Sequence, residues 1–115
     1  MPLVTIQTSV CMDAEAQARL LAKASAIVAE EIGKPEQYVM ATLSQGGVLM
    51  GGKDGPAAFA DVRSIGGLSG SVNGKISERL CEALGEVLSI PPDRVYINFS
   101  DVPAGRWGWN GGTFG

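Results

Sequence analysis

Hydrophobic and polar residues alternate at the start of the chain. Residues 3–8 are rich in β-branched side chains and place Val4 and Ile6 on one face, which predicts a strand almost at the N-terminus. The spacing then becomes helical for about 18 residues, with Asp13 as the expected N-cap and Gly33 at the end. The face expected to be buried consists of Ala18, Leu21, Ser25, Val28 and Ile32.

The same order of patterns occurs a second time. Residues 38–43 predict a strand that closes the first β-α-β unit, and Gly46-Gly47 predicts a turn into the short segment 48–50. The second unit is expected to consist of a strand at 58–65, a glycine-rich turn at 66–67, a helix that buries Ile76, Leu80, Ala83, Leu84 and Val87, and a strand at 95–99.

These patterns predict a single domain of the α/β (α+β) class over residues 1–115, with pseudo-repeats at about 2–50 and 57–103. The two units should form a four-stranded sheet with both helices on one face. Oligomerisation is the simplest way to cover the other face and the sheet edges. The tail 104–115 is rich in aromatic residues, so we expect it to be ordered and to add short edge strands to a neighbour.

Composition narrows the choice of partners. The 115 residues include 45% hydrophobic and 18% charged residues with a net charge of -3, which fits one compact domain and gives no basic excess for binding nucleic acid. No apolar run approaches the length of a membrane helix, and no charged start followed by an apolar run marks a signal peptide. We therefore expect a cytoplasmic protein that binds neither nucleic acid nor membrane.

Histidine is absent, and there are two cysteines. The absence of histidine excludes Ser-His-Asp and Cys-His nucleophiles and histidine-based zinc sites. Cys11 and Cys81 form no Cys-x-x-Cys pair, so we expect two buried thiols, no disulfide framework and no metal.

The N-terminal amine is the candidate base. Methionine is generally removed before proline, which would leave the nitrogen of Pro2 as a free secondary amine. Burial or a nearby cation lowers the pKa of such an amine towards neutrality, where it can abstract a proton. The alternative is that Met1-Pro2 is only a common way to begin a chain.

Three polar side chains have alternative interpretations. Lys34 follows the expected helix end, where it either stabilises the helix dipole or holds a substrate carboxylate. Tyr96 and Asn98 alternate on one strand face and belong either to a ligand site or to a polar subunit interface. The glycine-rich segment 66–70 matches neither phosphate-loop fingerprint, which argues against nucleotide binding.

Five motifs stand in a specific order along the chain. They are Met1-Pro2 before a strand, Gly33-Lys34-Pro35-x-Gln37-Tyr38, Ser64-Ile65-Gly66, Pro92-Asp93-Arg94-Val95-Tyr96-Ile97-Asn98 and Gly108-Trp109-Asn110-x-x-Thr113-Phe114. Together they resemble the macrophage migration inhibitory factor family of the tautomerase superfamily. The resemblance covers nearly the whole chain, and the order and spacing of the motifs make coincidence improbable.

The resemblance implies a homotrimer with active sites at subunit interfaces and keto-enol tautomerisation of phenylpyruvate-like 2-keto acids or dopachrome-type substrates, without a cofactor. In this scheme Pro2 is the general acid/base. Lys34 and the backbone of Ile65 contact the substrate, and the adjacent subunit supplies Tyr96 and Asn98. The pocket walls are Tyr38, Trp107, Trp109 and Phe114.

Departures from the family pattern also matter. Ala57 and Ala60 stand where animal members carry a Cys-x-x-Cys motif, so thiol-disulfide activity is not expected. Arg106-Trp107 replaces smaller uncharged residues, which predicts a narrower and more cationic rim. The alternative function is a cytokine-like trimer that binds a receptor and retains only weak or vestigial tautomerase activity.

Overall fold

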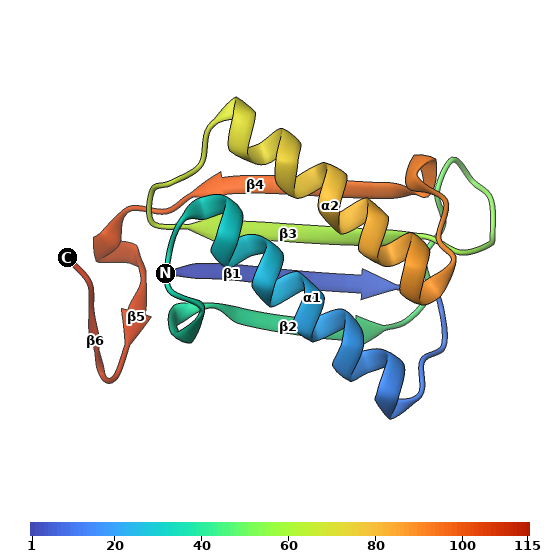
Figure 1. The fold of residues 1–115 in the computed structure, drawn as a ribbon, viewed down its shortest axis with the longest axis horizontal. Helices are drawn as coiled ribbons and strands as arrows, with labels where there is room; N and C mark the ends of the chain where they lie inside the picture. The colour runs from blue at the N-terminus through green and yellow to red at the C-terminus, as the bar shows by residue number, and fades with distance from the viewer.

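The computed structural model describes all residues from Met1 to Gly115. Two β-α-β units follow one another along the chain and lie side by side in one sheet (Figure 1). The first unit comprises β1 (Pro2–Thr8), α1 (Ala14–Ile32), the 3-10 turn η1 (Glu36–Tyr38) and β2 (Met40–Gln45). The second comprises β3 (Ala58–Ser64), α2 (Gly70–Leu88), η2 (Pro92–Arg94) and β4 (Val95–Asp101).

The tandem repeat is confirmed and is nearly exact. The interval from Pro2 to Ala58 also separates the starts of α1 and α2 and the starts of η1 and η2. The strand order is β2-β1-β3-β4, with the central pair β1 and β3 antiparallel and each outer strand parallel to its neighbour. The antiparallel centre sets the two units head to tail, so the start of β1 and the start of β3 lie at opposite ends of the sheet.

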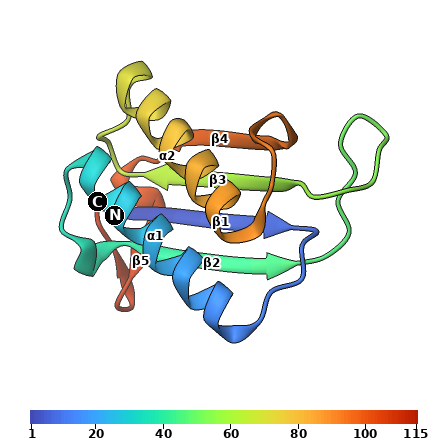
Figure 2. The same ribbon diagram turned by 45° about the vertical axis from the view of Figure 1, so that its right-hand side comes forward.

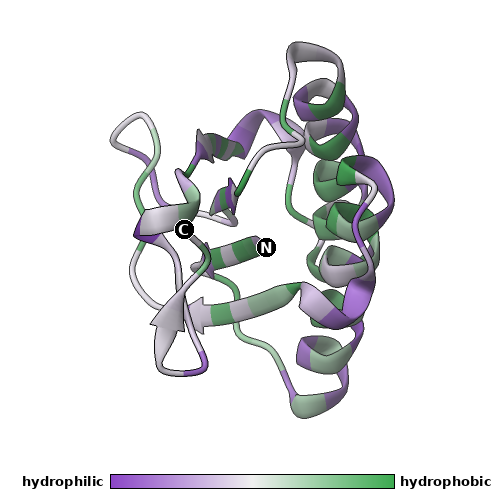
Figure 3. Cartoon of the chain, turned by 90° about the vertical axis from the view of Figure 1, so that its left-hand side faces the viewer, coloured by the Kyte–Doolittle hydropathy of each residue, from purple (hydrophilic) through white to green (hydrophobic).

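Both helices pack on one face of the sheet, as expected, and the opposite face is free of helices (Figure 3). The core between the layers is aliphatic and includes Ile6, Val62, Leu20 and Leu80, all fully buried. Burial of such side chains stabilises the fold by roughly 1.5–3 kcal/mol each. Alternate residues of the strands point to the helix-free face, where Met40, Phe59 and Tyr96 are among the exposed large hydrophobic residues.

Caps define the ends of the helices. The Asp13 carboxylate accepts a hydrogen bond from the Ala16 amide at 2.8 Å, as expected of an N-cap. Gly33 ends α1 in the left-handed conformation, with φ 79°, and its amide donates to the Ala29 carbonyl. This ending turns the chain back towards the sheet directly before Lys34.

The expected buried face of α1 was wrong by about one position. The buried residues are Leu20, Ala24, Ile27, Val28 and Ala29, whereas Ala18 is exposed. Alanine is abundant all around this helix, so several faces have similar helical spacing and packing against the sheet selects among them. In α2 the expected face is confirmed, except that Leu88 is buried and Val87 is half-buried.

Other local predictions need correction. Tyr38 lies in η1 and β2 begins at Met40, because Pro35 introduces a 3-10 turn before the strand. The segment 48–50 forms a single bridge between Met50 and Lys53. Cys11 is exposed in the β1–α1 connection and Cys81 is only half-buried, so the expectation of two buried thiols was wrong.

The tail folds back over the helix-free side of the sheet at the end where β1 starts (Figures 2 and 3). After the 3-10 turn η3 (Ala104–Arg106), β5 (Gly108–Trp109) and β6 (Gly112–Thr113) pair with each other. The tail is therefore ordered, as predicted, although its strands pair within the chain. None of the helices has the length and apolarity needed to cross a membrane.

Candidate active site

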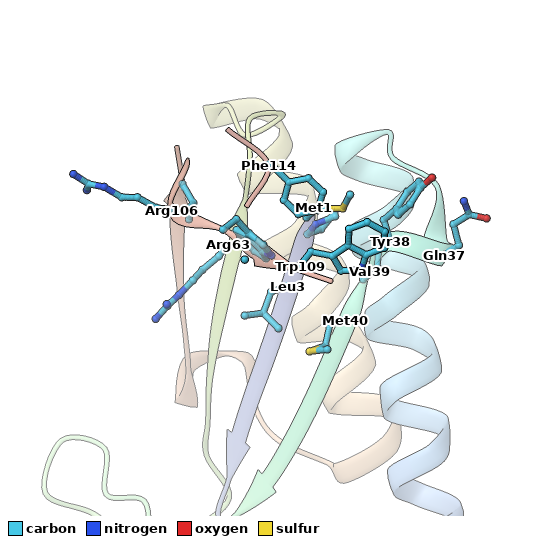
Figure 4. A pocket seen from close by; sticks show the side chains of 14 residues that line it. Met1, Leu3, Gln37, Tyr38, Val39, Met40, Arg63, Arg106, Trp109 and Phe114 are labelled. Carbon is cyan, nitrogen blue, oxygen red and sulfur yellow. The ribbon is translucent and has the colours of Figure 1, made fainter. Parts of the chain in front are cut away.

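A cavity of about 620 Å³ opens at the end of the sheet where β1 begins. The start of β1, the η1–β2 connection and the C-terminal tail form its walls (Figure 4). The lining residues are Met1, Pro2, Leu3, Gln37, Tyr38, Val39, Met40, Arg63, Val102, Arg106, Trp107, Gly108, Trp109 and Phe114.

The N-terminal amine lies at this cavity. Pro2 is fully buried at the start of β1, opposite Ser64 of β3, and Met1 is half-buried. Burial from solvent, together with the neighbouring Lys34 side chain, lowers the pKa of the Met1 amino group from 8.0 to about 6. An amine at this position is therefore largely unprotonated at neutral pH.

Lys34 is held behind the cavity by the turn that follows β3. Its Nζ donates a hydrogen bond to the carbonyl oxygen of Ile65. Gly67 has φ +80°, and a Cβ atom there would lie 2.6 Å from Cγ2 of Ile32. The glycine-rich turn therefore serves to pack closely against the end of α1, beside Lys34, and its role is structural.

Aromatic side chains form much of the cavity wall. Tyr38, Trp107, Trp109 and Phe114, the walls that the family resemblance implies, all line it. The rings of Trp109 and Phe114 stack with centroids 5.8 Å apart and planes inclined by 14°. The Phe114 amide donates to the Trp107 carbonyl at 3.2 Å, which fixes the tail against the mouth.

The two predicted site residues of β4, Tyr96 and Asn98, lie away from the cavity at Pro2. Tyr96 pairs with Phe59 and lines a different cavity, at the opposite end of the sheet, and Asn98 pairs with Asp61 near the strand middle. Neither lines the cavity at Pro2. Lys34 and Ile65 do not line it either. Within one chain, the structure brings together Pro2 and the aromatic wall, with Lys34 as a neighbour of the N-terminal amine.

Sequence reasoning missed part of the lining. Leu3, Val39, Met40, Arg63 and Val102 were not predicted as lining residues, and Gln37 entered only as part of a motif. In the sheet, Leu3 pairs with Met40 on one side and with Arg63 on the other. The alternation of side chains along each strand could have assigned the three residues to one face. No cluster of three or more Cys, Asp or Glu side chains is arranged to hold a metal ion.

Comparisons with known proteins agree with this architecture. The family model described as macrophage migration inhibitory factor matches residues 1–115. A macrophage migration inhibitory factor homolog from Brugia malayi is 39% identical over 116 residues, covering 100% of both chains. The crystal structure of a homologue from Prochlorococcus marinus has a TM-score of 0.91 and 46% identity, covering 98% of this chain and 99% of its own.

A more distant likeness comes from a protein studied with a small molecule. The crystal structure of Pt0534 inactivated by 2-oxo-3-pentynoate has a TM-score of 0.84 and 27% identity, covering 96% of this chain and 93% of its own. The match over the full length in sequence and the shared fold lead to one conclusion. The chain belongs to the macrophage migration inhibitory factor family, within the tautomerase superfamily.

Proposed function

We propose that this protein is a cofactor-independent keto-enol tautomerase that acts on phenylpyruvate-like 2-keto acids, with the amine of Pro2 as its general acid/base. The observation that supports this most directly is the lowered pKa of an amine at the cavity, about 6 for Met1. Removal of Met1 converts the nitrogen of Pro2 from an amide into a secondary amine. That amine belongs to a fully buried residue next to Met1, and burial from water disfavours the charged form of an amine.

The reaction moves one proton. The unprotonated Pro2 nitrogen removes a proton from C3 of the keto acid, and the electrons form the C2–C3 double bond of an enolate. The resulting Pro2 ammonium then delivers the proton to the carbonyl oxygen, which gives the enol and regenerates the amine. In this proposal Lys34 binds the substrate carboxylate with a donor that its hydrogen bond to Ile65 leaves free.

The cavity suits an aryl side chain. Tyr38, Trp107, Trp109 and Phe114 offer flat apolar surfaces that pack against a ring and keep water from the amine. The related protein Pt0534 is inactivated by 2-oxo-3-pentynoate, which is itself a 2-keto acid. The chemistry of the walls therefore supports phenylpyruvate-like acids, and dopachrome-type substrates share the same flat, anionic character.

We also propose a homotrimer in which Tyr96 and Asn98 of an adjacent subunit complete each site. The helix-free sheet face exposes Met40, Phe59 and Tyr96, which oligomerisation would cover. Light scattering should report about three times 11.9 kDa. A monomer at assay concentration would contradict the shared site.

The test of the catalytic proposal is the variant Pro2→Ala, which leaves a primary amine after Met1 removal. We expect kcat/KM for phenylpyruvate enol-keto exchange to fall by about 10²-fold or more, because general-base catalysis contributes roughly 10²–10⁴. A fall of less than about threefold would remove Pro2 from the mechanism. Intact mass must first confirm the N-terminus of each preparation.

Covalent labelling gives a readout that does not depend on turnover. An unprotonated amine adds to the conjugated triple bond of an alkynyl ketone. We therefore expect 2-oxo-3-pentynoate to label Pro2 in the chain without Met1, and peptide mass mapping will locate the label. Labelling elsewhere would contradict a reactive amine at this site. An inactive, unlabelled trimer that binds a receptor would support the cytokine-like alternative.

A further inference from the structure

The cavity at Pro2 is cationic in an acidic protein. The chain has a net charge of -3, yet no Asp or Glu is among the residues that line this cavity. Two arginines, Arg63 and Arg106, line it together with Met1, and Lys34 neighbours the N-terminal amine. Such a distribution favours the binding of anions in this cavity.

The two arginines differ in how their charge is used. Arg63 donates from Nε and Nη2 to one carboxylate oxygen of Asp61, at 3.1 and 2.9 Å. The Arg106 guanidinium has no hydrogen bond or ion pair within the chain, and its side chain is exposed. The backbone of Arg106 is nevertheless fixed, because its amide donates to the Pro103 carbonyl at 2.9 Å within η3. Arg106 is thus the uncompensated cation of the rim.

Lys34 and the two arginines come from different elements. Lys34 hydrogen-bonds the turn that follows β3 and neighbours the Met1 amine. Figure 4 shows Arg63 and Arg106 extending together to the side away from Tyr38 and Gln37. In the same view Met1, whose amine neighbours Lys34, lies near Phe114 and Tyr38, so Lys34 and the Arg106 guanidinium serve different parts of the cavity. A ligand that carries two anionic groups separated by a flat spacer can use both cations.

We propose that Arg106 is a specificity-determining residue that selects 2-keto acids bearing a second anionic group at the far end of the side chain. The inference rests on the proposed tautomerase function and narrows its substrate class. The keto-acid head lies at Pro2 and Lys34, and the spacer lies along Trp109 and Phe114. The distal carboxylate meets the Arg106 guanidinium, whose unfixed side chain turns over the mouth to pair with it.

The role of Arg106 is tested with two substrates that differ only in the charge of the distal group. 4-Carboxyphenylpyruvate carries a second carboxylate, and 4-carbamoylphenylpyruvate has nearly the same shape with an uncharged amide in its place. We expect the wild-type protein without Met1 to prefer the carboxy compound about fivefold in kcat/KM at low salt, the upper range for an exposed ion pair. Added salt should reduce the preference, because an exposed pair is screened.

Matched variants assign the effect. Arg106→Gln should reduce the preference to near unity. Arg19→Gln removes the same charge from another exposed arginine, on α1 and outside the cavity lining, and should keep the wild-type ratio. The proposal is overturned if the wild type shows no preference, or if Arg106→Gln retains it. A preference lost only in Arg63→Gln would assign the role to Arg63 and overturn the proposal equally.

Binding separates this inference from the proposed function. Both tryptophans of the chain, Trp107 and Trp109, line the cavity, so quenching of their fluorescence gives the Kd for each acid. If phenylpyruvate is not turned over, the proposed function fails while the ratio of Kd values still decides the role of Arg106. If phenylpyruvate is turned over but neither ratio depends on Arg106, the function stands and the inference fails.

Discussion

The two ends of the sheet are built from the same β-α-β unit, but they present different chemistry. At one end, the strand begins with Pro2 and a chain terminus, with Lys34 and Tyr38 behind and beside it. At the other end, the equivalent positions are Ala58, Ile90 and Arg94. A cavity of similar size, about 570 Å³, is present there too. The fold supplies a cavity at each end, and under the proposed function the residues that line each cavity decide which one is reactive.

The second end lacks each element of the proposed chemistry for a specific reason. Ala57 precedes Ala58 in a continuous chain, so no free amine exists there. Ile90, at 1% exposure, belongs to the core. Arg94 is engaged by the backbone of the 46–57 loop, where its Nε and Nη2 donate to the carbonyls of Pro56 and Lys53 at 2.8 and 2.9 Å.

The largest expected effect on stability comes from two single variants at the equivalent positions Lys34 and Ile90, each of which takes the residue of the other position. Ile90→Lys places an unpaired ammonium in the aliphatic core, and we expect it to lower the free energy of unfolding by about 3–5 kcal/mol. Lys34→Ile should cost about 1 kcal/mol or less, because Lys34 is half-buried and makes one hydrogen bond. Urea denaturation measures both. Equal losses would contradict the division between a core end and a site end.

The second effect concerns the loop at the non-catalytic end. Arg94→Ala removes the donors that hold the 46–57 backbone, so we expect a loss of about 1–3 kcal/mol in unfolding free energy. Amide hydrogen exchange should quicken in that loop and not in the C-terminal tail. The control Arg19→Ala should stay within about 0.5 kcal/mol of wild type. Unchanged exchange in the loop would show that Arg94 does not hold it.

The third effect sharpens the role of Lys34 at the catalytic end. If Lys34 binds the substrate carboxylate, Lys34→Ala raises KM by about tenfold and changes kcat little when measured well above the pKa of the amine. A loss confined to kcat would contradict carboxylate binding.

The same variant has a pH signature. A protonated amine cannot accept a proton, so kcat/KM falls as the pH drops below the pKa of the Pro2 amine. The Lys34 ammonium disfavours protonation of the N-terminal amine and so lowers its pKa. Lys34→Ala removes that effect and should move the acidic limb of the profile to higher pH. Lys34→Arg keeps the charge and should leave the limb near its wild-type position.

Local features of the fold were predictable from sequence. The two ends of α1 are set by Asp13, whose side chain caps the first turn, and by Gly33, whose backbone adopts the left-handed conformation. Both effects act within a few residues of the helix end, so the local sequence reveals them. The repeat was visible because each unit has the same order of patterns. The buried face of α1 was not predictable, because its many alanines leave the choice to packing against the sheet.

The candidate site was predicted unevenly for a related reason. Pro2, Lys34, Tyr38 and the tail aromatics were identified through motifs whose order resembles the family. Arg63 lines the cavity because β3 pairs with β1 in a register that sets it opposite Leu3. The register between two strands that are far apart in the sequence cannot be predicted from the spacing of residues within each strand. The exposure of Cys11 likewise depends on how the β1–α1 connection runs over the surface.

The central claim is that the free amine of Pro2 makes this end of the sheet catalytic. The most direct test measures phenylpyruvate enol-keto exchange on two preparations that differ only in Met1, each verified by intact mass. The account predicts exchange by the chain that begins at Pro2 and a loss of about 10²-fold or more when Met1 is retained, since the Pro2 nitrogen is then an amide. Equal activity in both preparations would contradict it.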